Sequence, residues 1–278
     1  MSRTRTSSSI ALIALTLAGG LIAVTPVLAQ QAQAEQGRRP ASTEERAAYG
    51  RLDPLARSVF WSREMEINPA DPVAGVKLAE ALRQMGQHEQ AASIGQQVLV
   101  AQPANVEAML EIGRAHIARG QAFYGIGPLE QAKALAPSDW RPLSLLGVAY
   151  QQVRRADDAR TAWNQALRLS PDNPEVLTNA AMALMTGGDA GGAETLLRRA
   201  VAQPTSTLQM RLNLAMVLGL QGKTGEAEQI IRRDLPPEAA DRNLEWLRNQ
   251  TRPAATASVA TDAASPALVR TWSSLQGQ

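Results

Sequence analysis

The sequence predicts an all-α protein, built as a right-handed solenoid of short helical repeats. Prolines recur at one constant spacing, at Pro69, Pro103, Pro137 and Pro171. Small residues recur at the same spacing in the segments between them. Aromatic residues make up only 4% of the chain, and no run alternates β-branched with polar residues as strands do. Together these observations favour helix pairs that are stacked end to end.

The most complete copy of the repeated unit lies near the middle of the chain. Its signature residues are, in order, Leu143, Leu146, Gly147, Tyr150, Ala159, Trp163 and Pro171. Their order and spacing match the tetratricopeptide pattern, a helix–turn–helix unit of about 34 residues. We expect Gly147 and Ala159 to lie where the two helices cross closely, and Pro171 to end the second helix because proline lacks an N–H group.

Small residues at two equivalent positions set the register of the other copies. In the first helix they are Ala79, Gly113, Gly147, Ala181 and Ala215, and in the second helix they are Ala91, Gly125, Ala159, Ala193 and Ala227. Glycine marks the turn between the helices in four copies, and Arg154 stands there in the other. The predicted repeats are 72–105, 106–139, 140–173, 174–206 and 207–240. In the last repeat Asp234 occupies a position that is small or apolar elsewhere, and we expect it to be buried.

Additional helices are predicted to cover both ends of the stack, since a solenoid needs atypical end units to remain soluble. Helices at 43–50 and 54–67, within a half-repeat at 42–71, would cover the first repeat. A capping helix at 237–249 would cover the last, with Leu244, Trp246 and Leu247 on its apolar face. A polar linker at 30–41 precedes the helices. A tail at 250–278, rich in Ala, Thr, Ser and Pro, is predicted to be disordered.

The N-terminus has the composition of an export signal. Arg3 and Arg5 precede an apolar stretch that ends at Ala29, a small residue suited to cleavage. A second acceptable cleavage site ends at Ala34. Residues 1–29 are therefore predicted to be a signal peptide and the mature protein to be periplasmic. The alternative is an N-terminal membrane anchor that is retained, because the apolar stretch has roughly the length of a bilayer span.

Composition argues against several classes of function. Cleavage after Ala29 removes two of the 28 basic residues and none of the 26 acidic ones, so the mature chain is near neutral and has no bias towards nucleic acid. There is no cysteine and there are only two histidines, His88 and His116. We therefore expect no catalytic site, metal, cofactor or small-molecule substrate. The Gly222-Lys223-Thr224 triplet lacks the glycine that a phosphate-binding loop has five residues earlier, and Gly222 aligns with the inter-helix turns.

Binding of a protein partner is the function that the architecture itself favours. Stacked first helices line a groove, and its candidate residues are Lys77, Glu80, Arg83, Arg114, Arg141, Gln151, Asn179, Met182, Met185, Asn213 and Met216. Asn179 and Asn213 are equivalent positions whose amides suit the main chain of an extended peptide. Arg114 and Arg141 suit a carboxylate. The alternative is a solvated groove with local ion pairs.

Residues 53–249 resemble the TadD family of the Flp/Tad (tight adherence) pilus assembly apparatus. The segment DLPPE at 234–238, followed by a helix with the pattern N-x-x-x-L-R, is the most specific part of the resemblance. The resemblance implies an exported interaction scaffold that supports assembly of a type IV-like pilus, with pilus assembly components and the outer-membrane secretin as partners. Members are often lipoproteins, and this chain has no cysteine to carry lipid. The alternative function is that of a generic periplasmic chaperone or adaptor.

Overall fold

The computed structural model describes residues 39–251, and this range holds thirteen helices and no strand. The predicted all-α solenoid is confirmed. The helices are α2 (Thr43–Tyr49), α3 (Pro54–Ile67), α4 (Pro72–Gln84), α5 (His88–Ala101), α6 (Val106–Ala118), α7 (Ala122–Leu135), α8 (Trp140–Gln152), α9 (Ala156–Leu169), α10 (Pro174–Thr186), α11 (Ala190–Val201), α12 (Leu208–Leu220), α13 (Thr224–Asp234) and α14 (Pro237–Thr251). The predicted signal peptide, most of the linker and nearly all of the tail lie outside the described residues.

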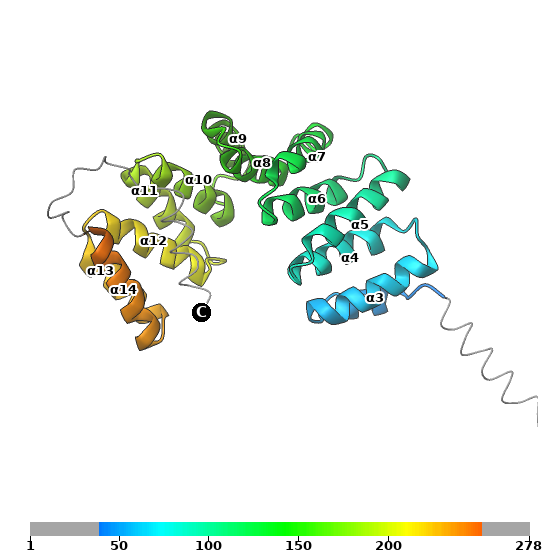
Figure 1. Ribbon diagram of the computed structural model, residues 1–278, viewed down its shortest axis with the longest axis horizontal. Helices are drawn as coiled ribbons and strands as arrows, with labels where there is room; N and C mark the ends of the chain where they lie inside the picture. Colours follow the sequence, from blue (N-terminus) through cyan, green and yellow to red (C-terminus); the bar gives the residue numbers. More distant parts are fainter. Residues whose placement is uncertain (1–38, 252–278) are drawn as a thin grey trace, which may run out of the picture.

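The helices follow one another along an arch, with α3 at one end and α14 at the other (Figure 1). Helices α4 to α13 form five pairs, and the two members of each pair pack against each other. The first helices of successive pairs (α4, α6, α8, α10 and α12) also contact one another. They therefore share one face of the solenoid, and side chains from neighbouring repeats meet there. Between residues 39 and 251, none of the helices has the length and apolar character that crossing a bilayer requires.

Four of the first helices begin at an Asp or Asn that lies two residues after a repeat proline. The side chains of Asp71, Asn105, Asp139 and Asn173 each accept a hydrogen bond from a backbone N–H of the helix that follows. Such a bond satisfies an amide that has no partner within the helix. The proline therefore ends one helix and the capping residue starts the next, which explains the fixed period.

All ten small positions predicted from the sequence are buried. A Cβ atom on Gly147 would lie 2.4 Å from two atoms of the Trp163 ring. Gly147 therefore makes room for the indole of the second helix rather than for its backbone, which differs from the expectation. Gly125 does face backbone, since its Cβ would lie 3.3 Å from the carbonyl oxygen of Gly113. The small positions thus accommodate either a large side chain or a close helix crossing.

The turn within each pair has a residue in the left-handed region of backbone conformation. Four of these residues are glycines, for example Gly120 with φ of 71°. Arg154 occupies the equivalent turn of the middle repeat and has φ of 61°. Left-handed backbone costs a non-glycine residue roughly 1–2 kcal/mol, so the surrounding helices impose this geometry.

Both ends of the stack are covered. At the N-terminal end, Phe60 and Trp61 of α3 pack with α4 in one buried cluster. At the C-terminal end, Leu244 and Leu247 of α14 are 5% and 4% exposed, within the core that α12 and α13 form. Asp234 is 9% exposed on its side chain and pairs with Arg211 of α12 at 2.6 Å. A counter-charge therefore accompanies the acidic residue that replaces a small one.

Candidate partner-binding groove

A groove of about 580 Å³ opens along the face shared by α4 and α6. Its apolar part comes from Val73 and Val76 of α4, and Val73 is 51% exposed. Charged side chains of both helices surround this part, and Glu175 of α10 joins them from a later repeat. Helix spacing explains the arrangement, because residues three or four apart project from the same side of a helix.

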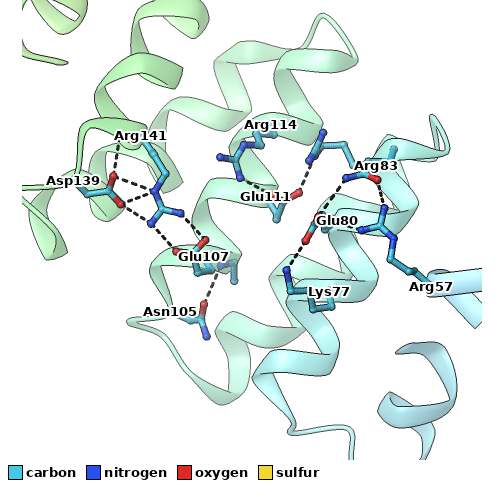
Figure 2. A network of polar contacts seen from close by, with 12 residues as sticks. Arg57, Lys77, Glu80, Arg83, Asn105, Glu107, Glu111, Arg114, Asp139 and Arg141 are labelled. Atoms are coloured by element: carbon cyan, nitrogen blue, oxygen red, sulfur yellow. Dashed lines mark hydrogen bonds and ion pairs between the residues drawn. The ribbon is translucent and has the colours of Figure 1, made fainter. Parts of the chain in front are cut away.

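At the groove, two arginines from adjacent repeats hold one glutamate. Arg83 Nε of α4 donates to Glu111 Oε2 at 2.8 Å, and Arg114 Nη1 of α6 donates to Glu111 Oε1 at 2.6 Å (Figure 2). Glu111 is only 4% exposed. Within the described chain, each arginine uses one nitrogen in these hydrogen bonds, although a guanidinium carries five N–H donors. Both arginines line the groove, so their remaining donors are available to a partner.

A second acidic residue of the groove is also neutralised. Glu80 Oε2 accepts from Lys77 Nζ at 2.8 Å, and Glu80 Oε1 accepts from Arg57 Nη1 of α3 at 3.3 Å (Figure 2). Desolvation opposes ionisation of Glu80, but the bonds from Lys77 and Arg57 hold its pKa below the usual value. The carboxylate is therefore charged at neutral pH, and it ties α3 to α4.

Arg141 of α8 lies beside the groove and is fully engaged. Its Nη1 and Nη2 bond the two carboxylate oxygens of Glu107 at 3.0 and 2.7 Å, and its Nε and Nη2 bond Asp139 (Figure 2). The hydrogen bonds to Asp139 and Glu107 raise the pKa of Arg141. Although burial acts in the opposite direction, the bonds from Arg141 keep the pKa of Asp139 below its ordinary value. Glu107 and Asp139 therefore already occupy the nitrogens of Arg141, and its capture of a partner's carboxylate stays a prediction.

Three further predicted groove residues lie farther along the solenoid. Asn179 of α10 donates to Ser144 Oγ at 3.3 Å, and Gln151 of α8 donates to Thr186 Oγ1 at 3.1 Å. Met182 is half-buried and packs against the C-terminal core. None of the three lines the groove between α4 and α6. A direct role for them in holding a partner stays a prediction.

Two of the predicted groove residues are wrong as contact residues. Met216 is fully buried. Asn213 is 7% exposed, and its Oδ1 accepts a hydrogen bond from Gln209 at 3.0 Å. The cause is the C-terminal cap: α12 contacts α14 as well as α10 and α13, so it is buried nearly all round. Met185 is likewise buried, at 5% exposure.

The two histidines are partly buried. His116 lies beside Tyr124, with ring centroids 5.8 Å apart, and burial together with nearby Arg119 lowers the pKa of His116. The ring is therefore neutral at neutral pH, as expected of a packed side chain. His88 begins α5 and is half-buried. Among residues 39–251, no group of three or more His, Asp or Glu side chains is placed to hold a metal ion.

The glycine-lysine-threonine triplet forms the turn between α12 and α13, as predicted. Gly222 has φ of 82°, and Lys223 Nζ pairs with Glu194 Oε2 at 2.5 Å. The preceding element is the helix α12, whereas a phosphate-binding loop follows a strand. The lysine thus links the last two repeats.

Several groove residues were missed by the sequence reasoning: Val73, Val76, Glu107, Glu111 and Glu175. A signal for the acidic ones exists in the aligned repeats. Glu107 lies one repeat length before Arg141, and Glu111 lies one repeat length after Lys77. Glu107 does pair with Arg141 across the repeat boundary, whereas Glu111 pairs with Arg83 and Arg114 rather than with Lys77.

Comparisons with known proteins agree with this geometry. Family models described as tetratricopeptide repeat match residues 76–138, 144–207 and 209–233. The chain belongs to the tetratricopeptide repeat (TPR) family. TPR solenoids are interaction scaffolds, because the stacked helices present an extended binding surface. A search among curated proteins finds no match.

Solved TPR structures resemble this chain in fold. The TPR protein TTC0263 of Thermus thermophilus is 22% identical, with a TM-score of 0.56 over 68% of this chain and 98% of that one. The pilF protein of Pseudomonas aeruginosa is 17% identical, with a TM-score of 0.55 over 64% and 83%. The structure of the Cut9–Hcn1 hetero-tetramer matches with 12% identity and a TM-score of 0.63 over 73% and 41%. At these low sequence identities, the similarity to the three structures establishes a shared fold alone.

Proposed function

We propose that this TPR protein is a non-enzymatic scaffold of the bacterial cell envelope that supports assembly of Flp/Tad-type pili. The groove between α4 and α6 carries the binding part of this proposal. Arg83 and Arg114 line it, and each directs one nitrogen to the buried Glu111. The resemblance of residues 53–249 to the TadD family, together with the predicted export signal, supports the pilus and the envelope location.

The groove is suited to a protein segment that combines apolar and acidic side chains. Val73 and Val76 provide apolar contact area, whose burial contributes about 25 cal/mol per Å². A carboxylate of the partner would bind the remaining N–H donors of Arg83 and Arg114, and arginine binds carboxylates in a bidentate fashion. The ion pairs among the groove's own residues hold adjacent repeats at a fixed spacing, so the two guanidinium groups are positioned before the partner arrives.

Replacement of both arginines by glutamine tests the groove. In the R83Q/R114Q variant an amide can still donate to Glu111, but the positive charge that attracts a partner's carboxylate is absent. Because Glu111 then lacks both counter-charges, circular dichroism must show that the variant remains folded before its binding is compared. We expect affinity for the envelope partner to fall about tenfold or more, as it does when one member of a desolvated charge pair is removed. The measurement is recovery of pilus assembly components by the tagged protein from envelope extracts, together with the number of surface pili in a complemented deletion strain.

The matched control replaces two exposed arginines outside the groove, Arg168 of α9 and Arg248 of α14, by glutamine. It changes net charge equally and should leave capture and pili intact. An equal loss of capture and of surface pili in both variants would contradict the binding role of the groove. Loss of capture with normal pili would support the groove and contradict the pilus role, favouring a chaperone or adaptor for another envelope assembly.

A further inference from the structure

A second cavity, of about 480 Å³, lies at the junction of the third and fourth repeats, away from the groove. Trp163 and Leu167 of α9 form one wall, and Leu184 and Leu196 of α10 and α11 form another. Alanines supply most of the remaining apolar surface. We call this cavity the junction slot.

In the preceding junction an aromatic side chain occupies the equivalent space. There, Tyr150 of α8 is 8% exposed, and its hydroxyl donates a hydrogen bond to Glu130 of α7. The guanidinium of Arg155 lies 4.4 Å from the centroid of the Tyr150 ring. Burial, together with the Glu130 carboxylate, raises the pKa of Tyr150 to about 12, so the phenol remains a donor. An aromatic ring with a polar tip thus closes this junction.

The equivalent residues one repeat later leave the slot open. At those positions Leu184 replaces Tyr150, Asn164 replaces Glu130 and Asp189 replaces Arg155. All three replacements line the junction slot. The side chain at the aromatic position is smaller, and an acceptor remains at the place of Glu130. At the place of Arg155 the charge changes from positive to negative, while Arg160, which also lines the slot, is paired with Asp157. The slot is therefore suited to an aromatic ring with an N–H or O–H donor and a cation nearby.

The C-terminal segment of this chain contains such a combination. Trp272 is the single aromatic residue in the sequence from 252 to 278, and Arg270 lies two residues before it. An indole N–H can donate to the amide oxygen of Asn164. A guanidinium beside it complements the exposed carboxylate of Asp189. The indole and the guanidinium of the segment thus complement the amide oxygen of Asn164 and the carboxylate of Asp189 in the slot.

The chain between the end of α14 and Trp272 is also long enough to reach the junction slot. Trp272 follows the end of α14, at Thr251, by roughly 20 residues, and a flexible linker of this length would span about 25 Å on average. Helix α14 packs on α12, and α12 packs on α10. Two helix-to-helix steps of 8–10 Å amount to roughly 20 Å. When the reach of a tether matches the span, its effective concentration is highest, about millimolar.

We propose that the junction slot binds the indole of Trp272 from the chain's own C-terminal segment, with Arg270 against Asp189. The segment then completes the apolar junction between repeats three and four, as Tyr150 completes the preceding one. This intramolecular docking is separate from the groove and does not depend on the proposed pilus function.

Engineered cysteines test the docking in the full-length chain, which has none of its own. In the variant R160C/S273C, oxidised glutathione should form an intramolecular disulfide about tenfold faster than in the same cysteine pair with Trp272→Ala, because docking raises the local concentration above that of a free tether. Arg160 is an exposed residue that lines the slot, and its replacement leaves Asn164 and Asp189 in place. Adding Leu184→Tyr, which fills the slot from within, should reduce the rate to that of the Trp272→Ala variant.

Circular dichroism identifies any variant that loses helicity, and Trp272→Ala changes no residue of the solenoid. Equal rates with Trp272 and with Trp272→Ala would overturn the proposal. So would a disulfide that forms only between two chains, which would assign the slot to a second copy. A fast intramolecular disulfide that survives both Trp272→Ala and Leu184→Tyr would also contradict it.

Discussion

The Gly147→Leu variant should lose several kcal/mol of stability, at the upper end of the effects known for overpacked cores. A Cβ atom at this position already lies 2.4 Å from Cε2 and Nε1 of Trp163. The indole cannot retreat easily, because Trp163 is 2% exposed and its Nε1 donates to the carbonyl oxygen of Ser144 at 3.2 Å. Overpacking usually costs about 1–3 kcal/mol, and we expect about 3 kcal/mol or more here. Urea unfolding followed by circular dichroism measures the loss.

Gly225→Leu is the matched control for this variant. Gly225 also lies in a helix, α13, but a Cβ atom there meets nothing within 4 Å. Leucine is a better helix former than glycine by roughly 1 kcal/mol, so this variant should be unchanged or slightly more stable. If Gly147→Leu proved as well tolerated as the control, the packing of α8 against α9 given above would be wrong.

The Arg46→Met variant should release the N-terminal helix α2 from the solenoid. Arg46 bonds Glu64 Oε2 through Nε at 2.9 Å and Nη2 at 2.6 Å, and it reaches Asp71 at 2.7 Å. Glu64 is 2% exposed, so without Arg46 its carboxylate lacks a counter-charge. Removing one partner of a buried ion pair lowers the stability of the fold by about 3–5 kcal/mol, because the other charge stays buried without a partner. Detachment of α2 would hydrate Glu64 and limit the loss, so we expect a lower melting temperature and rapid hydrogen exchange in residues 43–49.

A double variant separates the charge effect from lost packing. In Arg46→Met/Glu64→Leu both charges are absent, and an apolar pair of similar size often matches a buried ion pair in stability. We expect the double variant to recover most of the melting temperature that the single variant loses. A double variant as unstable as Arg46→Met would show that the other contacts of Arg46, its pair with Asp71 and its packing 5.8 Å from the Trp61 ring centroid, matter more than its pair with Glu64.

The helical architecture could be predicted because its determinants are local in sequence. A proline ends each second helix, and a capping residue such as Asp71 or Asn105 starts the next first helix. The glycine turns follow from backbone conformation, and Arg154 shows that the neighbouring helices can impose the same turn without glycine. The packing partner of Gly147 was less predictable, because the space beside a small residue can hold either backbone or a large side chain.

The groove was predictable only in part, because its contacts join different repeats. Arg141 was expected to be available, but the packing of α8 on α6 places Glu107 of the preceding repeat 2.7 Å from it. Asn213 and Met216 occupy first-helix positions like those of groove residues in earlier repeats, yet α14 and the neighbouring helices bury them. A single-repeat pattern cannot reveal which copy lies at the covered end.

A photo-crosslinking residue placed at Val73, which lines the groove between α4 and α6, tests in living cells whether this groove holds a protein partner in pilus assembly. Val100 of α5 is the exposed control outside the groove. We expect position 73 to capture a pilus assembly component and position 100 to capture none. Capture of the same proteins from both positions, or of no pilus assembly component from position 73, would contradict it.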